Sequence, residues 1–594
     1  MNILEHGTLL EPLRRLFGDG GDAAVEDALR VLRVVKLNGG ETLMRQGDPC
    51  DGVYFVVSGR LRAYAERNGG RVILGDISRG ETVGETGVFT GEARSASVIA
   101  VRDSVLAYAD RDAFVGLWRR HPGFSMNMAR VIVDRVNRPP ARPGARRASA
   151  ICLVPITDGI DVQQFGEEVA RALGRWGQAT FETRETINAR FGRGAADAVQ
   201  RDTEGYQRLA TWLEEIESRS DFVLLLADDG ESEWTRRCIR ACDEVLLVAR
   251  ADAPPRIHPI EQRLFLRDEP ITGARQTLLL LHPKSRRTPT GTTRWLDRRP
   301  VDAHLHIRPE LPGDLARLAR MLSGNTTGLV LSGGGARGFA HLGVYKALEE
   351  AGFEIDMVGG TSIGSVMSAY VAFDLPVAQM IEQARKAFVR NPTADVNYLP
   401  LLSLIQGRRL KIVITDAVVD AVGCEIDAVD TWKTFYCVSS SYSRARELVI
   451  TRGPLERALR SSVSIPVALP PVTWNGELLV DGGIFNNFPA DVMVKMGARK
   501  IIGVDLAPQR DEVTHALEEI PSPWSLFWDR CRGRNEHRLP NLGSMLVGTT
   551  MLYSASRTEE ARRSVDLYIN PRCEGVGLLD WKAFDRAVDV GYRA

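Results

Sequence analysis

The pattern of hydrophobic positions at the start of the chain is that of short β-strands. Apolar runs such as Val53 to Val57, Leu61 to Ala65 and Val105 to Tyr108 are separated by glycine turns. This spacing predicts a small β-barrel or jelly roll. A helical stretch is expected from Ala113 to Val136.

A proline-rich segment follows that helix. Asn137-Arg-Pro-Pro-Ala-Arg-Pro-Gly-Ala-Arg-Arg cannot continue a helix, because proline lacks the amide hydrogen and its ring clashes with the preceding turn. Its four arginines have no apolar face beside them, so we interpret them as part of a solvated linker rather than as a site for anionic headgroups.

The rest of the chain shows two α/β patterns in succession. The first, from Ile151 to about Arg308, has buried-strand runs between helix-like segments and no recognisable catalytic residues. Those runs are Ile151 to Pro155, Phe222 to Ala227, Val245 to Ala249 and Leu278 to Leu281.

The second pattern begins at Thr327 with a strand, a glycine loop and a helix, followed by another strand, glycine loop and helix. Such a succession predicts a mostly parallel sheet whose chemistry lies in the loops at the carboxyl ends of its strands. We therefore predict a multidomain protein with a β-barrel or jelly-roll domain (1–137), a Pro/Arg linker (138–149), an α/β middle region (150–326) and a C-terminal α/β domain (327–594).

Composition and charge exclude several classes. The 594 residues include 76 basic and 76 acidic ones, so the total charge gives no sign of a nucleic-acid partner. No window of 18 uninterrupted apolar residues occurs, and we expect a cytoplasmic protein whose contact with membranes, if any, is peripheral. The eight cysteines are scattered, and Cys238 and Cys242 lack a second pair of zinc ligands nearby.

A candidate nucleophile lies in the second glycine loop. Gly360-Thr361-Ser362-Ile363-Gly364 has the G-x-S-x-G form between a strand and a helix, which is the context of a nucleophile elbow. The flanking glycines Gly360 and Gly364 leave room for a sharp turn, and the turn places the Ser362 hydroxyl at the positive N-terminus of the next helix.

The first glycine loop predicts an anion site. Ser332-Gly-Gly-Gly-Ala-Arg-Gly338 joins a strand to a helix, so the amides of Gly334, Gly335 and Ala336 are placed to bind a tetrahedral oxyanion. The same residues fit a dinucleotide fingerprint with Asp356 about 20 residues on. In that alternative the second strand would have to supply both the acid of the dinucleotide site, Asp356, and the Ser362 turn six residues later, which are incompatible roles. No Walker lysine is present either.

A candidate base follows a third strand, at Leu478-Leu-Val-Asp481-Gly482-Gly483. A Ser, Asp, His order requires a histidine after the acid, and only His515 and His537 follow, both in polar, irregular surroundings. A Ser362–Asp481 dyad requires no histidine, because Asp481 accepts the serine proton directly.

These three motifs together resemble those of the patatin-like phospholipases. In addition, Trp234-Thr-Arg-Arg-Cys-Ile-Arg-Ala-Cys-Asp243 and Val358-Gly-Gly-Thr-Ser-Ile-Gly364 are similar to the neuropathy target esterase family. That family joins cyclic-nucleotide-binding domains to a patatin domain. Animal members also carry an N-terminal transmembrane helix and several nucleotide-binding domains, whereas this sequence shows no span and room for one such domain.

The resemblance implies phospholipase or lysophospholipase activity without a catalytic cofactor or metal. It implies that Ser362 and Asp481 form the dyad and that Gly482 and Gly483 of the Asp-Gly-Gly motif lie beside the base. It also implies an oxyanion hole in the first glycine loop. The residues of that hole are Gly333, Gly334, Gly335, Ala336, Arg337 and Gly338.

The N-terminal domain contains a second resemblance. Gly84-Glu85-Thr86-Gly87-Val88-Phe89 followed by Arg94-Ser95-Ala96 is similar to the phosphate-binding cassette of cyclic-nucleotide-binding proteins. The similarity assigns Gly84 and Glu85 to the cassette, with Glu85 on the ribose, and Arg94 with Ser95 on the phosphate of cAMP or cGMP. A degenerate domain that binds nothing is the alternative.

Three further features receive structural interpretations. His341 falls inside a helix and is expected to pack or to form a local hydrogen bond. His304 and His306 are expected to be an ordinary exposed pair, and Tyr398 to Ile405 to be buried core rather than an apolar mouth for acyl chains.

Two functions from different classes follow from the sequence. The first is a serine lipid hydrolase that cleaves acyl esters of phospholipids or lysophospholipids and is regulated by a cyclic nucleotide. The second is a cyclic-nucleotide sensor whose hydrolase module is vestigial.

Overall fold

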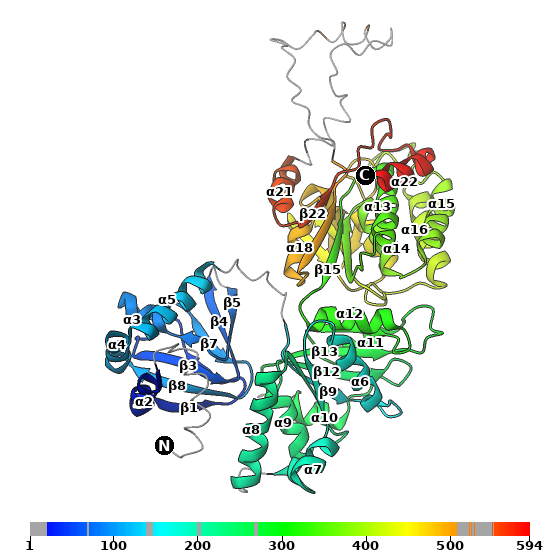
Figure 1. Ribbon diagram of the computed structural model, residues 1–594. Coiled ribbons are helices and arrows are strands. Elements are labelled where there is room, and N and C mark those ends of the chain that lie inside the picture. Colours follow the sequence, from blue (N-terminus) through cyan, green and yellow to red (C-terminus); the bar gives the residue numbers. More distant parts are fainter. Residues whose placement is uncertain are drawn as a thin grey trace. The chain divides into compact units, whose positions relative to one another are not determined.

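Figure 1 shows a computed structural model of the chain, which describes residues 21–67, 70–137, 147–198, 203–266, 271–507 and 552–594, with 522, 524, 528 and 549. The chain forms two compact units. The first contains Met1–Arg286 and Arg294–Asn325, and the second Arg287–Thr293 and Thr326–Ala594. Residues 138–146 of the predicted linker lie outside the described residues.

The N-terminal domain consists of two antiparallel four-stranded sheets, with strand orders β1-β8-β3-β6 and β2-β7-β4-β5. Alternate apolar side chains of both sheets, among them Val56, Leu61 and Leu106, meet in one core. The predicted jelly roll is thereby confirmed. Its strands are β1 (Arg33–Leu37), β2 (Thr42–Met44), β3 (Gly52–Ser58), β4 (Arg60–Arg67), β5 (Gly70–Ser78), β6 (Thr82–Val83), β7 (Ser97–Ala100) and β8 (Ser104–Asp110).

The helices of this domain are α2 (Gly21–Val31), α3 (Glu85–Thr90), α4 (Arg111–Arg120) and α5 (Pro122–Asn137). The helical stretch predicted from Ala113 to Val136 is confirmed except at His121, where the chain breaks between α4 and α5. That residue has φ −123° and ψ 88°, since the following proline disfavours the helical conformation in the residue before it.

The middle region is built on a six-stranded sheet in which all neighbouring strands are parallel, in the order β10-β11-β9-β12-β13-β14. The predicted apolar runs are four of these strands. Their bounds are β9 (Ala150–Pro155), β10 (Ala179–Glu182), β11 (Phe222–Leu226), β12 (Glu244–Arg250), β13 (Arg275–Leu281) and β14 (Ala303–Ile307).

Helices cover both faces of this sheet. α6 (Val162–Leu173) and α12 (Pro312–Leu322) pack on one face, against side chains such as Leu153 and Val248. The other face, with Val154 and Leu247, contacts the remaining helices. These are α7 (Arg184–Phe191), α8 (Thr203–Arg219), α9 (Glu233–Ala241), α10 (Pro259–Leu264) and α11 (Thr292–Leu296), with a 3-10 turn at Ala195–Asp197.

The C-terminal domain has an eight-stranded mixed sheet in the order β19-β20-β17-β16-β15-β21-β22, with β18 also paired to β17. β16, β15, β21 and β22 run parallel to one another and to β17, whereas β18 and β20 are antiparallel to β17. The strands are β15 (Thr327–Leu331), β16 (Met357–Thr361), β17 (Thr434–Ser441), β18 (Arg446–Ile450), β19 (Val472–Trp474), β20 (Glu477–Asp481), β21 (Lys500–Val504) and β22 (Leu567–Ile569).

Both faces of this sheet are also covered (Figure 1). Successive side chains of β15 point to opposite faces of the sheet, so Leu329 and Leu331 pack against one helical layer and Val330 packs against the other. The first layer contains α13 (Ala340–Glu350), α14 (Ile363–Ala372), α15 (Val377–Val389), α16 (Arg408–Val422), α17 (Leu455–Ser462) and α22 (Phe584–Arg593), and the second α18 (Ala490–Lys495) and α21 (Leu552–Arg562). Among the described helices, none has the length and hydropathy needed to cross a bilayer.

Candidate active site

Ser362 occupies a strained turn between β16 and α14. Its φ of 55° and ψ of −130° lie in a region that residues with a Cβ rarely adopt. The turn also brings the backbone of the neighbouring strand close: a Cβ on Gly360 would lie 2.4 Å from the Leu331 carbonyl oxygen, and one on Gly364 2.3 Å from it. The two glycines are therefore required by a close backbone approach.

The side chain of Asp481 contacts this serine directly. Ser362 Oγ donates a hydrogen bond to Asp481 Oδ2 at 2.7 Å, and the amide of Gly483 donates to Oδ1 at 2.7 Å. The topology explains the meeting, because β17 lies between β16 and β20 and pairs Val438 with Thr361 and Ser439 with Asp481. Gly482 is fixed by the same approach, since a Cβ there would lie 2.1 Å from the Val438 carbonyl oxygen.

Burial sets the protonation of this carboxyl group. Asp481 is 1% exposed, and burial raises its pKa from 3.8 to about 6, against the opposing effect of the hydrogen bonds from Ser362 and Gly483. A carboxylate with such a pKa is ionised at neutral pH and is a better proton acceptor than an exposed aspartate.

Two serines that the sequence analysis missed form hydrogen bonds with the backbone of the turn and of Asp481. The amide of Ser362 donates to Ser462 Oγ at 2.9 Å, and Ser462 Oγ donates to the Val438 carbonyl at 2.6 Å. The amide of Asp481 donates to the carbonyl of Ser464 at 2.8 Å. Only their position at the C-terminal end of α17 connects these serines to the site, so the run Ser461-Ser462-Val463-Ser464 carries no recognisable signal in the sequence.

The first glycine loop lies beside Ser362, but its amides do not all point to a common site. A Cβ on Gly333 would lie 3.1 Å from Ser362 Cβ. The Gly333 amide donates to the Asn487 carbonyl at 3.2 Å, and the Ala336 amide donates to the Leu578 carbonyl at 2.8 Å. The expectation that Ala336 offers a free donor was therefore wrong, because the segment containing Leu578 occupies it.

Gly334 and Gly335 retain the donors of this loop. Their amides make no hydrogen bond within the described part of the chain, and the φ of 57° at Gly335 turns the backbone at the start of the 3-10 turn Gly335–Phe339. Arg337 points away from such a role, since its Nε donates to the Val576 carbonyl at 2.9 Å. Gly338 is fixed by packing, since a Cβ there would lie 2.4 Å from Ile363 Cγ2.

The histidines have structural roles. His341 Nε2 lies 2.8 Å from the Ser332 carbonyl, and burial lowers its pKa to about 4, as expected for a neutral packing residue. The expectation of an exposed His304–His306 pair was wrong for His306, which is 2% exposed and hydrogen-bonded to His282 at 3.0 Å. No cluster of potential metal ligands occurs among the described residues.

Of the cassette residues in the N-terminal domain, Gly84 and Glu85 lie at the start of α3, and Arg94 and Ser95 follow its end. Glu85 and Arg94 are both 4% exposed, whereas Ser95 is exposed. The Arg94 guanidinium donates to the carbonyls of Gly84 at 3.0 Å and Gly52 at 2.9 Å, and pairs with Asp51 at 2.5 Å. Gly84 has φ 88°, and a Cβ there would overlap the guanidinium. Arg94 is thus preorganised and already paired with a carboxylate.

The C-terminal domain therefore has the fold and the serine turn of a patatin-type domain. The family model "Patatin-like phospholipase" matches residues 329–494, the "Neuropathy Target Esterase family P-loop like domain" matches 147–312, and the "Cyclic nucleotide-binding domain" matches 34–121. The chain thus contains, in this order, the three kinds of domain that these models describe: a cyclic nucleotide-binding domain, a P-loop-like domain of the neuropathy target esterase type and a patatin-like phospholipase domain.

Curated relatives resemble nearly the whole chain. "Lysophospholipase nte1" of Aspergillus fumigatus is 31% identical over 94% of this chain and 41% of its own length. "Neuropathy target esterase sws" of Drosophila melanogaster is 30% identical over 94% and 42%, and "Patatin-like phospholipase domain-containing protein 6" of Homo sapiens 30% identical over 93% and 43%. The chain thus spans less than half the length of these relatives.

Proposed function

We propose that this protein hydrolyses acyl esters of phospholipids or lysophospholipids through a Ser362–Asp481 dyad. The observation that carries the proposal is the 2.7 Å hydrogen bond from the hydroxyl of Ser362, in its strained turn, to the buried carboxylate of Asp481. The names of the curated relatives, which include lysophospholipases, support the choice of substrate class.

The geometry supports a two-step reaction. In the first step Ser362 Oγ attacks the acyl carbonyl carbon while Asp481 Oδ2 takes its proton. The amides of Gly334 and Gly335 are the donors that we assign to the tetrahedral oxyanion. Protonated Asp481 then gives its proton to the leaving alcohol, and an ester of Ser362 with the fatty acid remains.

The second step reverses these roles. Water enters where the alcohol left, Asp481 accepts its proton, and the hydroxide attacks the ester carbon of the acyl-enzyme. The collapse of this intermediate releases the fatty acid and returns the proton to Ser362. One carboxylate therefore serves as base and then as acid in each step.

The experiment that tests the proposal uses the full chain and lysophosphatidylcholine. We expect release of free fatty acid, together with labelling of Ser362 by a fluorophosphonate, located by mass spectrometry of the digested protein. Labelling of Ser362 that stops fatty-acid release supports the dyad. Absence of release from several acyl esters by folded protein would move the assignment to the nucleotide-sensor alternative.

The pH dependence of the reaction should follow Asp481. Because the pKa of this buried carboxyl is raised to about 6, we expect kcat/KM for a soluble ester to be constant above about pH 7 and to fall roughly tenfold per pH unit below about pH 6. Circular dichroism at each pH verifies that the protein remains folded. A rate that stays constant down to about pH 4 would show that Asp481 is not the base.

We also propose that the N-terminal domain binds cAMP or cGMP and thereby regulates hydrolysis. The supporting observation is the pair of buried polar side chains Glu85 and Arg94 in one cassette. A cyclic phosphate that reached Arg94 would have to replace Asp51, the present partner of its guanidinium.

Two substitutions test the nucleotide site in opposite directions. Arg94→Ala should abolish binding of cAMP or cGMP in calorimetry, whereas Asp51→Asn should tighten binding by several-fold, because the phosphate no longer competes with a carboxylate. Weaker binding in Asp51→Asn would show that Asp51 assists the ligand. Binding without any ester hydrolysis would favour the sensor function.

A further inference from the structure

A cluster of large apolar side chains lies exposed in the segment between α15 and α16. Tyr398 is 97% exposed and Leu401 81% exposed, and Val396, Leu399, Leu402 and Leu404 are each more than half exposed. We call residues 396–404 the apolar loop. The expectation that Tyr398 to Ile405 forms buried core was therefore wrong for Tyr398, Leu399, Leu401, Leu402 and Leu404, whose side chains are exposed, whereas Ile405 packs against the core.

The backbone of the apolar loop is hydrogen-bonded within itself. Val396 and Ile405 form an isolated antiparallel bridge, the Asn397 amide donates to the Leu404 carbonyl at 2.8 Å, and Ser403 Oγ donates to the Ile405 carbonyl at 2.7 Å. Polar groups thus turn inward while apolar side chains turn outward. These hydrogen bonds lower the cost of moving the loop into an apolar phase, because the groups that form them are already paired.

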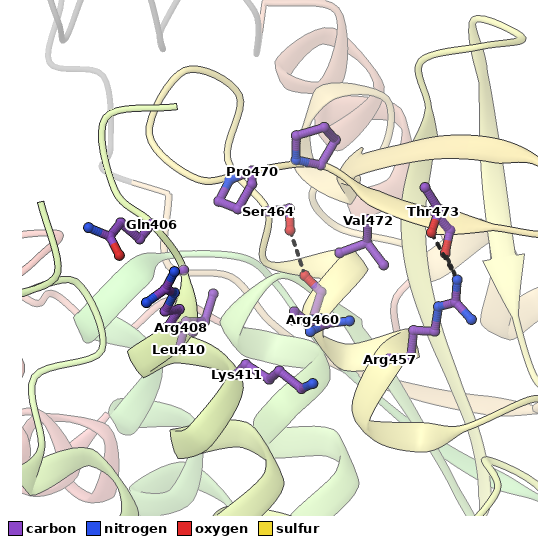
Figure 2. A pocket seen from close by; sticks show the side chains of 12 residues that line it. Gln406, Arg408, Leu410, Lys411, Arg457, Arg460, Ser464, Pro470, Val472 and Thr473 are labelled. Carbon is purple, nitrogen blue, oxygen red and sulfur yellow. Dashed lines mark hydrogen bonds between the residues drawn. The ribbon is translucent and has the colours of Figure 1, made fainter. Parts of the chain in front are cut away.

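A pocket of about 450 Å³ lies next to the loop in sequence, because its lining begins at Gln406. Figure 2 shows Arg408 and Lys411 from α16 and Arg457 and Arg460 from α17 around it, and none of its lining residues is acidic. Arg460 lies 3.6 Å from Glu456, whereas Arg408 and Lys411 have no ion-pair partner within the described part of the chain. We call this the basic pocket.

The basic pocket is linked to Asp481 through the backbone of Ser464. Ser464 lines the pocket, and its carbonyl accepts the amide of Asp481 at 2.8 Å. Three residues further along, the Val467 carbonyl accepts the amide of Leu404 at 2.8 Å. One short segment therefore connects the apolar loop, the basic pocket and the base.

That segment is strained at Val467. Its φ of 68° is a genuine outlier for a β-branched residue, and such a conformation persists only where the surrounding structure holds it. The side chain of Val467 is 55% exposed. It is therefore one more apolar group on the surface beside the apolar loop.

We propose that the apolar loop and the basic pocket form a docking surface for an anionic phospholipid bilayer. The apolar side chains enter the acyl region, Tyr398 lies at the interface, and the four cations contact anionic headgroups. This inference rests on the proposed lipid hydrolysis for its purpose: a docked domain receives its lipid beside Ser464 and Asp481 without release of the lipid into water.

Charge complementarity distinguishes this partner from a second copy of the chain. A symmetric contact between two copies through this surface would bring two sets of four cations together, which is unfavourable. An anionic bilayer supplies both the apolar phase for the loop and the negative charge for the pocket.

The test measures binding separately from hydrolysis. The full chain carrying Ser362→Ala is sedimented with vesicles of phosphatidylcholine, with and without phosphatidylglycerol, so that no substrate is consumed. We expect binding to the anionic vesicles that weakens at high salt and falls by roughly tenfold or more with Leu401→Asp and Leu402→Asp together. Arg408→Glu with Lys411→Glu should remove the preference for anionic vesicles.

Matched controls come from the amino ends of interior strands of the sheet. Phe353→Asp and Lys500→Glu alter an exposed apolar residue and an exposed cation before β16 and at the start of β21, and both should bind vesicles as the parent protein does. In protein that retains Ser362, the Leu401→Asp and Leu402→Asp variant should hydrolyse a soluble short-chain ester at the unchanged rate.

Several outcomes would overturn the proposal. Vesicle binding that is absent in the parent protein, or unchanged by the paired leucine substitutions, shows that this surface does not dock on bilayers. Conversion of a dimer to a monomer by those substitutions, with vesicle binding unaffected, assigns the surface to a second copy. Competition by free glycerol phosphate against vesicle binding, with no loss in the leucine variant, assigns the basic pocket to a soluble phosphate instead.

Discussion

Replacement of Ser362 by alanine is expected to lower fatty-acid release by about 10⁴-fold or more, because no other group in the turn can form the acyl-enzyme. The backbone should keep its conformation, since the Ser362 amide remains bound to Ser462 Oγ and alanine also carries a Cβ. Removal of the Oγ atom that donates to Asp481 leaves a small space that one water can fill.

The matched control is Ser368→Ala in α14, the helix that follows the turn. Ser368 is fully buried, and its hydroxyl has no hydrogen-bond partner among the described residues, so its loss should change the rate by less than about threefold. Release of fatty acid from lysophosphatidylcholine is the measurement for both variants. Activity of Ser362→Ala close to that of the parent would eliminate the acyl-enzyme mechanism.

Replacement of Asp481 by asparagine is expected to change activity and stability in opposite directions. The rate should fall by about 10²- to 10⁴-fold, because an amide cannot accept the proton of Ser362. The free energy of unfolding should rise at neutral pH. Folding raises the pKa of this carboxyl from 3.8 to about 6, so the buried carboxylate costs about 3 kcal/mol above pH 6 relative to acid pH, and asparagine removes that cost.

The sign of this effect is visible in its pH dependence. The favourable contribution of protonated Asp481 is fully present below about pH 4 and is lost as the pH rises through about 6, so the stability gain of the variant should shrink as the pH is lowered. Denaturant unfolding at pH 8 and at pH 5 measures it. A variant that is less stable than the parent at pH 8 would show that the hydrogen bonds to Asp481 outweigh its desolvation.

Asp430→Asn provides the comparison for both readouts. Burial also raises the pKa of Asp430, which accepts the amide of Thr292 at 3.0 Å, but this carboxyl lies outside the dyad. We expect its substitution to affect stability and to leave fatty-acid release within a few-fold of the parent. Loss of activity in both variants would indicate a general effect of buried carboxyls on the fold.

Features that depend on local sequence were predicted well. The strands at Ile151 and Leu278 were predictable because strands of a parallel sheet are apolar on both faces. The turn at Ser362 was predictable because glycines on both sides of a serine, between a strand and a helix, serve few other purposes. Pro122 could also have predicted the break at His121, but the hydrophobic positions on both sides of it have helical spacing and indicated a continuous helix.

Features that depend on contacts between distant segments were not predictable. Ala336 loses its free amide to Leu578, which lies more than 200 residues further along the chain. The apolar loop has the composition of a core segment, and only the structure shows that its leucines are exposed.

The sequence by itself determined the three-domain order, the jelly roll, the α/β class of the other domains and the identity of the candidate dyad, because each follows from local periodicity or from a short motif. Only the tertiary structure decided which glycine-loop amides remain available, which serines hold the turn and where the apolar loop faces. Hydrogen bonding and burial are properties of pairs of segments, and a pattern along one segment does not contain its partner.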